Sequence, residues 1–346
     1  MITLHIFMGI PGAGKSTKIK ELKSRLENVV VIGTDEEYRK QFGELTGAIP
    51  HDVRAQFFGG IREKIFSTLK YAVDEKAELN LIFDATNLNR KRRRFLFLEA
   101  HRVGVDHLEV HWVSALPENA HVQNEQRSGD RVVHREHLEQ HFAGLNIPRK
   151  GVDCDSFIIY NNPISEDFAK RVQELEYFEP QAYAWEMSWL KDSMTKRFLM
   201  QNIVPHDTRH HLESVDMHID LVNEQAQLID AENLTLRYAA FFHDLGKGQV
   251  KGKVELENAI GQFKSHDNVG AQFAMLALDK ACLLDDVRFE DVPELVGKHM
   301  LAHVMGPRLS KATRVRHGLS EHFLDELALL NKADDRGRVL LGKELK

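Results

Sequence analysis

The chain has 346 residues, of which 42% are hydrophobic and 28% are charged. These are the proportions of a globular protein, and the length favours two domains. The formal net charge of −6 argues against a clamp on nucleic acid along the whole chain, because such a clamp needs clustered Lys and Arg. No apolar run approaches membrane-spanning length and no signal peptide precedes the first strand. We therefore expect no membrane partner. Cys154 and Cys282 lack metal-ligand spacing, which favours a reducing, cytoplasmic setting.

The first part of the chain alternates between strand and helix signals. This alternation predicts an α/β domain over residues 1–162, with a parallel sheet and helices on both faces. Binding residues should then lie at the carboxyl ends of the strands. The expected strands are the apolar runs Leu4–Met8, Val29–Ile32, Leu79–Phe83, Leu108–Val113 and Phe157–Tyr160. The expected helices include Thr17–Leu26, Ile61–Val73 and Arg92–Arg102.

A phosphate-binding loop follows the first of these strands. Residues Gly9–Ser16 read GIPGAGKS and match the complete pattern G-x-x-x-x-G-K-[ST] between a strand and a helix. Backbone N–H groups of such a loop surround a polyphosphate, Lys15 reaches the β- and γ-phosphates, and Ser16 holds Mg²⁺. The predicted cofactors are ATP and Mg²⁺. The predicted nucleotide-binding residues are Gly12, Ala13, Gly14, Lys15, Ser16 and Thr17.

A charged segment follows the second strand and reads TDEEYR, from Thr34 to Arg39. Asp35 should cap the next helix and share a face with Arg39, four residues later. A carboxylate here could accept a proton from an attacking hydroxyl, and the guanidinium could hold a phosphate of the acceptor. The alternative is an N-cap Asp with an ordinary ion pair along the helix.

A second polar segment, DATNLN, begins at Asp84 after the third strand and leads into five consecutive cations, Arg90–Arg94. Asp84 should lie near the mouth of the phosphate-binding loop. Cations at a helix start oppose the macrodipole, so the run indicates either a bound anion or a solvated basic face.

A third segment, Gln126–Arg131, follows the helix after the fourth strand, where kinases with a phosphate-binding loop carry a closing lid. An arginine in a lid can stabilise charge on the transferring phosphoryl group. Arg127 is the first choice and Arg131 the second. The alternative for either residue is an ordinary surface arginine.

Together these motifs resemble the kinase domain of phage-type polynucleotide 5′-hydroxyl kinases, over roughly Met1–Tyr160. The resemblance implies transfer of the ATP γ-phosphate to a 5′-OH end of RNA or DNA. It implies Asp35 as general base, Arg39 on the acceptor phosphate and Arg127 as lid arginine. We also expect Asp84, Thr86 and Asn87 to contact the acceptor.

Two departures from the family pattern are present. The family usually spaces its acid and arginine as D-x-x-R, whereas this chain has D-x-x-x-R, so Glu36 could take the place of the acid. The family reads D-T-N-L-N where this chain inserts Ala85, which leaves the role of Asp84 open. The aspartate-nucleophile phosphatase motif of the phage enzyme is not found here.

From Trp185 onward only helical periodicity is found, so we expect a linker or connecting helix over 163–184 and an all-α domain over 185–346. Within it, His243 and Asp244 are adjacent in the segment FFHDLGK. Such a pair offers one nitrogen and one oxygen ligand to a hydrolytic metal. The order His…His-Asp…Asp resembles the HD phosphohydrolase superfamily, in particular the HD domain attached to some bacterial tRNA nucleotidyltransferases.

This second resemblance implies a metal set of His218, His243, Asp244 and Asp334, with His243 and Asp244 central to catalysis. His210 and His211 compete with His218 for the first position. Mixed nitrogen and oxygen ligation suits Ni, Mn, Co, Fe or Zn, so the metal stays open. Further contacts to substrate phosphate, or to a second metal, are expected from Lys247, His266 and His299.

The two halves together indicate healing of nucleic-acid ends. A 5′-OH kinase and a phosphohydrolase that removes 2′,3′-cyclic, 2′- or 3′-phosphate would prepare RNA or DNA ends for a ligase acting downstream. One alternative is a small-molecule or nucleoside kinase fused to a nucleotidase or phosphodiesterase. Another is a regulatory module whose HD domain senses a nucleotide.

Overall fold

The computed structural model describes residues 1–43, 50–127, 132–175, 213, 215–250, 263–305 and 319–339. It divides the chain into two compact units, Met1–Pro163 and Ile164–Lys346. Helix α7 (Glu166–Glu174) opens the second unit and packs against helix α11 (His266–Lys280) of that unit. The predicted connecting segment 163–184 lies outside the described residues from position 176 onward.

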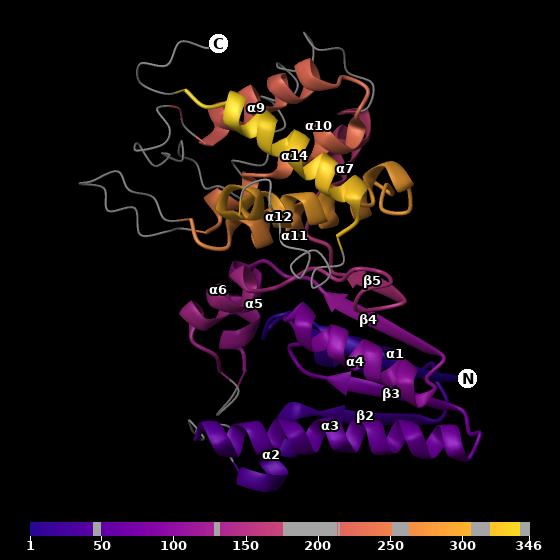
Figure 1. Ribbon diagram of the computed structural model, residues 1–346. Coiled ribbons are helices and arrows are strands. Elements are labelled where there is room, and N and C mark those ends of the chain that lie inside the picture. Colours follow the sequence, from indigo (N-terminus) through magenta and orange to yellow (C-terminus); the bar gives the residue numbers. More distant parts are fainter. Residues whose placement is uncertain are drawn as a thin grey trace. The chain divides into compact units, whose positions relative to one another are not determined.

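The first unit is built on a five-stranded parallel sheet with the order β2-β3-β1-β4-β5 (Figure 1). The predicted parallel sheet is confirmed, and each predicted run falls on one strand. The strands are β1 (Ile2–Met8), β2 (Val29–Gly33), β3 (Leu79–Asp84), β4 (His107–Val113) and β5 (Ser156–Tyr160). All seven residues of β1 are buried, as expected for the central strand of a sheet covered on both faces.

Helices cover both faces of this sheet, as predicted. The connection from β1 to β2 and the connection from β3 to β4 cross the sheet in opposite directions, so right-handed crossovers place their helices on opposite faces. The helices are α1 (Lys15–Lys23), α2 (Thr34–Phe42), α3 (His51–Asp74), α4 (Arg90–Val103), α5 (Pro117–Glu125) and α6 (Arg135–Ala143). Because β2, β3 and β1 are neighbours, the segments that follow them meet at one edge of the sheet.

The described part of the second unit contains helices and no strands. Besides α7 and α11, its elements are α9 (Val215–Ile229), α10 (Leu234–Phe242), α12 (Val292–Met305), α14 (Glu321–Arg336) and the short 3₁₀ turns η4 (Leu245–Gly248) and η5 (Val287–Phe289). Helix α14 packs on α9 and α12, and α11 packs on α12. Their shared core holds large apolar side chains, among them Phe241, Phe242, Phe273, Phe289 and Phe323. Among the described helices, none has the length and apolarity needed to cross a membrane.

Candidate functional site

The phosphate-binding loop connects β1 to α1 through backbone that only glycine adopts easily. Gly12 and Gly14 have φ of +86° and +96°, in the left-handed region. A Cβ on Gly12 would collide with the carbonyl oxygen of Ala120 in α5. The side-chain amide of Asn161, just after β5, donates to the carbonyl of Ala13 at 3.3 Å. The loop is therefore held by the segments that follow β4 and β5.

Lys15 begins α1 and points its ammonium group back into the loop. Its Nζ donates to the carbonyl oxygens of Gly9 at 2.8 Å and Ile10 at 3.1 Å. Burial lowers the pKa of Lys15 to about 8, although the charges of Asp84 and Asp35 oppose that shift. Burial also raises the pKa of Asp84, and its charged neighbours are Lys15, Asp35 and Arg127. The structure therefore brings together four residues that the sequence predicted for phosphoryl transfer.

Asp35 and Glu36 differ in their surroundings. Helix α2 begins at Thr34 with Gly33 as its N-cap, so the expectation that Asp35 caps the helix is wrong. Asp35 lies in the first turn, exposed to solvent, and its charge acts on Lys15. Glu36 instead forms an ion pair with Lys40 at 2.8 Å. Arg39 is half-buried one turn after Asp35. Of the two acids, only Asp35 is among the charges that act on Lys15.

The segment after β3 is tied to the phosphate-binding loop by its backbone and one side chain. The carbonyl of Thr86 accepts a hydrogen bond from the Gly9 amide at 3.1 Å. Asn87 has a φ of +46° and donates from its side chain to the carbonyl of Phe7 at 2.8 Å. These contacts fix the edge of the sheet beside the loop. A direct contact of Thr86 or Asn87 with an acceptor stays a prediction.

The basic run Arg90–Arg94 is neither a uniform solvated face nor a set of five cations facing an anion. Arg93 is fully buried and is held by Asp153 and by three backbone carbonyls, those of Asn87, Asn146 and Ile147. Arg90 also donates to the carbonyl of Ile147. Two of the five cations therefore have internal partners, while Lys91 and Arg92 are exposed.

Arg127 follows α5 and is half-buried. Just before it, the buried side chain of Asn124 donates to the carbonyl of Val133 at 2.6 Å and accepts from the Val133 amide at 3.0 Å. Arg131 lies outside the described residues. No sequence motif marks Asn124, because its two hydrogen bonds go to a residue nine positions further along the chain.

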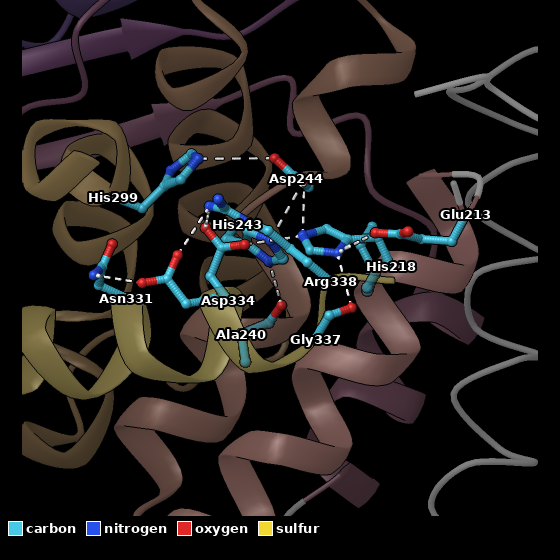
Figure 2. A network of polar contacts seen from close by, with 12 residues as sticks. Glu213, His218, Ala240, His243, Asp244, His299, Asn331, Asp334, Gly337 and Arg338 are labelled. Atoms are coloured by element: carbon cyan, nitrogen blue, oxygen red, sulfur yellow. Dashed lines mark hydrogen bonds and ion pairs between the residues drawn. The ribbon is translucent and has the colours of Figure 1, made fainter. Parts of the chain in front are cut away.

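The second unit gathers the predicted metal ligands from separate helices (Figure 2). His218 comes from α9, His243 and Asp244 follow α10, and Asp334 comes from α14. His218 Nε2 lies 3.0 Å from Asp334 Oδ1 and 3.7 Å from Asp244 Oδ2. His243 Nε2 lies 3.5 Å from the same Asp244 oxygen. His210 and His211 lie outside the described residues, so only His218 can be placed among the three competing histidines.

Asp244 divides its two carboxylate oxygens between two groups of histidines. Oδ2 faces His218 and His243, whereas Oδ1 lies 3.3 Å from His266 Nε2 and 3.7 Å from His299 Nε2. A Cβ on Gly246 would collide with the carbonyl of His266, so the turn after Asp244 packs directly on the start of α11. The two sets His218–His243–Asp244 and Asp244–His266–His299 each offer three ligand atoms that lie close together.

The Nδ1 atom of each histidine in these sets has a polar partner outside the cluster. The Nδ1 atoms of His243, His266 and His299 lie 2.6–2.7 Å from the carbonyls of Ala240, Phe263 and Val296. The Nε2 atoms therefore face inward, which is the arrangement that orients metal-bound histidines. His243 Nε2 is buried and has no hydrogen-bond partner among the described residues. The cluster thus fits a metal ion by its donor set and by this one buried nitrogen.

Glu213 is a further residue of this cluster that the sequence analysis missed. It is buried, and its Oε1 lies 3.1 Å from His218 Nδ1. Burial alone would lower the pKa of His218, but hydrogen bonds with Asp334 and Glu213 raise it to about 9. Burial lowers the pKa of His243 to about 4. No motif marks Glu213, because its role depends on a contact within the folded unit.

Lys247, expected to hold a phosphate oxygen, lies beside the cluster. Its Nζ is 2.6 Å from Asp244 Oδ2, and the ammonium also lies over the ring of Phe263 at 5.8 Å. In this structure it therefore balances the charge of Asp244. A phosphate contact of Lys247 stays a prediction.

One comparison with known protein families falls on the first unit. A family model described as an AAA domain matches residues 4–146. No curated protein matches the chain. A solved structure of a Pnkp1/Rnl/Hen1 complex aligns with a TM-score of 0.29 and 20% identity, over 34% of this chain and 37% of that chain. A structure of the Pnkp1/Rnl/Hen1 RNA repair complex aligns with a TM-score of 0.35 and 18% identity, over 41% and 43%. The chain therefore spans less than half the length of either structure's aligned chain.

Proposed function

We propose that the chain is a bifunctional enzyme that heals nucleic-acid ends. The first unit transfers the γ-phosphate of ATP to 5′-OH ends of RNA or DNA. The second removes a 2′,3′-cyclic, 2′- or 3′-phosphate with a metal-dependent HD-type site. One observation carries the proposal: one chain combines a phosphate-binding loop, whose Lys15 interacts with the charges of Asp84, Arg127 and Asp35, with a buried cluster of histidines and aspartates.

In the kinase reaction, the 5′ oxygen of the acceptor attacks the γ-phosphorus while the bond to the bridging oxygen breaks and ADP leaves. Asp35 accepts the proton of the attacking hydroxyl, because it is the exposed carboxylate beside Lys15. Lys15 and Arg127 stabilise the charge on the transferring group. Arg39, one helical turn from Asp35, grips the acceptor phosphate. Ser16 at the exposed start of α1 would hold Mg²⁺.

In the second unit, His218, His243, Asp244 and Asp334 would hold one divalent transition metal. His266 and His299 would either hold a second ion together with Asp244 or contact a substrate phosphate themselves. A metal held by these residues would act as a Lewis acid on the phosphate and would lower the pKa of a water molecule beside it. Glu213 orients His218 through Nδ1. The ammonium group of Lys247 forms an ion pair with Asp244 at the edge of the cluster. Lys247 can exchange this ion pair for a contact with a phosphate oxygen of the substrate.

The substrate class follows from combining the two chemistries. Cleavage of RNA that leaves a 2′,3′-cyclic phosphate also leaves a 5′-OH, and a ligase needs the opposite ends, a 3′-OH and a 5′-phosphate. A chain with both activities would supply both of these ends. We therefore infer that an RNA or DNA ligase acts on its product.

The test separates the two activities with single substitutions. Lys15→Ala should abolish 5′ phosphorylation of an oligonucleotide and leave removal of the 3′-terminal phosphate unchanged. His243→Ala should do the reverse. Lys91→Gln, an exposed cation of α4, serves as the matched control and should keep both activities. Loss of both activities from either change in a folded protein would contradict independent sites. Phosphorylation of mononucleosides without any action on oligonucleotides would instead support a nucleoside kinase.

A further inference from the structure

A second cluster of metal-binding side chains lies in the first unit, away from the phosphate-binding loop. His5 in the middle of β1 is paired in register with Glu109 of the neighbouring strand β4. His111 lies two residues after Glu109, so its side chain emerges on the same face of the sheet. His5 and His111 are buried, whereas the Glu109 side chain is 21% exposed. The cluster therefore has one side chain in contact with solvent.

Three atoms of this cluster point at one another. His5 Nδ1 lies 3.0 Å from His111 Nε2, and His111 Nε2 lies 3.1 Å from Glu109 Oε2. The third side of the triangle, from His5 Nδ1 to Glu109 Oε2, is 3.6 Å. Metal–ligand bonds of about 2.0–2.2 Å place neighbouring ligand atoms roughly 2.8–3.6 Å apart for angles between 90° and tetrahedral. The triangle thus has the dimensions of one face of a coordination sphere.

The outer atom of each side chain has its own partner. His5 Nε2 lies 3.2 Å from Asn80 Oδ1, and the Asn80 amide nitrogen donates to the carbonyl of Glu27 at 2.8 Å. The Asn80 oxygen therefore acts as the acceptor, which puts the proton of a neutral His5 on Nε2 and leaves a lone pair on Nδ1, inside the triangle.

The other two side chains follow the same arrangement. His111 Nδ1 lies 3.0 Å from the hydroxyl of Tyr160, and Ser156 donates its hydroxyl to Glu109 Oε1 at 3.0 Å. All three outer partners are polar groups of neighbouring strands. Such outer partners orient metal ligands and set their protonation state.

We propose that His5, Glu109 and His111 bind a divalent transition-metal ion of the Zn²⁺ class, which ties β1 to β4 and is separate from the metal cluster of the second unit. Two imidazole nitrogens and one carboxylate oxygen form a donor set that suits such ions. The ion would stabilise the strand that leads into the phosphate-binding loop, because Met8 at the end of β1 directly precedes Gly9.

The experiment measures bound metal in the full-length chain. Wild type, Glu109→Gln and Glu63→Gln are stripped with chelator, loaded with Zn²⁺ or Co²⁺, passed through a desalting column, and analysed for metal per chain. Glu63→Gln is the matched control, because Glu63 is an exposed carboxylate of α3 and lies outside the triangle. Glu109→Gln should bind about one metal ion fewer than wild type and lose part of the Co²⁺ absorption. Glu63→Gln should match wild type.

An equal metal content in folded Glu109→Gln and wild type would overturn the proposal, whatever the second unit binds. If Glu109→Gln does not fold, Tyr160→Phe is analysed instead, since it keeps all three ligands and removes only the partner of His111. The proposal then predicts about tenfold weaker binding of one metal equivalent. Unchanged binding isotherms for Tyr160→Phe would overturn it equally.

Discussion

The guanidinium of Arg93 is joined to the carboxylate of Asp153, with Nε and Nη2 2.8 and 2.7 Å from the same oxygen and both side chains fully buried. The Asp153 carboxylate also accepts from the Arg149 amide. Arg93 in turn contacts the carbonyl of Asn87, beside the phosphate-binding loop. The pair therefore connects the segment after β3 with the segment before β5.

We predict that Asp153→Asn destabilises the first unit by about 3–5 kcal/mol, because it leaves a buried cation without its counter-charge. The exposed neighbour substitution Lys91→Gln should change the free energy of unfolding by no more than about 0.5 kcal/mol. Urea unfolding of the full chain followed by circular dichroism measures both. Equal unfolding midpoints for the two variants would show that the buried pair contributes nothing specific.

Gly12→Ala should lower the affinity for ATP at least about tenfold. The added Cβ would require movement of the Ala120 backbone, and the positive φ is strained for alanine. Gly151→Ala is the matched control, since Gly151 has a φ of +72° and no described atom lies within 4 Å of its added Cβ. It should cost about 1–2 kcal/mol of stability and leave ATP binding intact. A fluorescent ATP analogue reports the affinity, and normal binding by Gly12→Ala would refute the tight loop packing.

Asn124 positions the chain next to Arg127. Asn124→Ala removes both hydrogen bonds to Val133 and should lower kcat of the kinase reaction about tenfold, with less effect on KM for ATP, because a small displacement of a catalytic group is costly. Val122→Ala, an exposed position on the same helix, is the comparison. A pure loss of stability at unchanged kcat would mean that Asn124 has no role in placing Arg127.

Glu213→Gln should weaken metal binding by the second unit about 10–100-fold, because it removes the carboxylate that orients His218. Glu224→Gln, an exposed position of α9, should bind metal like wild type. Isothermal titration with Mn²⁺ or Ni²⁺ on chelator-treated protein compares the two variants. Indistinguishable affinities would mean that Glu213 does not act on the metal ligands.

The sheet could be predicted because its strands are short, β-branched and apolar runs between polar segments. The segments Val29–Gly33 and Leu79–Asp84 show this pattern in their own residues. Because their strands are neighbours in the sheet, the residues that follow them lie at the same edge. The convergence of Lys15, Asp84 and Asp35 was foreseeable for the same reason. The charges of Asp84 and Asp35 act on Lys15 because all three residues follow parallel strands that end at one edge of the sheet.

Other features depended on contacts that no local pattern reveals. The burial of Arg93 is decided by Asp153, sixty positions further along the chain, so the basic run could not be divided into internal and exposed cations from the sequence. The cap of α2 was misplaced by two residues, because Gly33 already adopts the extended backbone of an N-cap. The contact of Glu213 with His218 likewise forms only when the unit folds.

The most direct test uses one RNA oligonucleotide with a 5′-OH and a 2′,3′-cyclic phosphate, incubated with the full chain, ATP, Mg²⁺ and a panel of transition metals. Mass spectrometry follows both ends. The account predicts a phosphate gained at the 5′ end and, with a suitable metal, the terminal phosphate lost at the other end to leave hydroxyls. No change at either end, under conditions where the same protein phosphorylates mononucleosides, would contradict it.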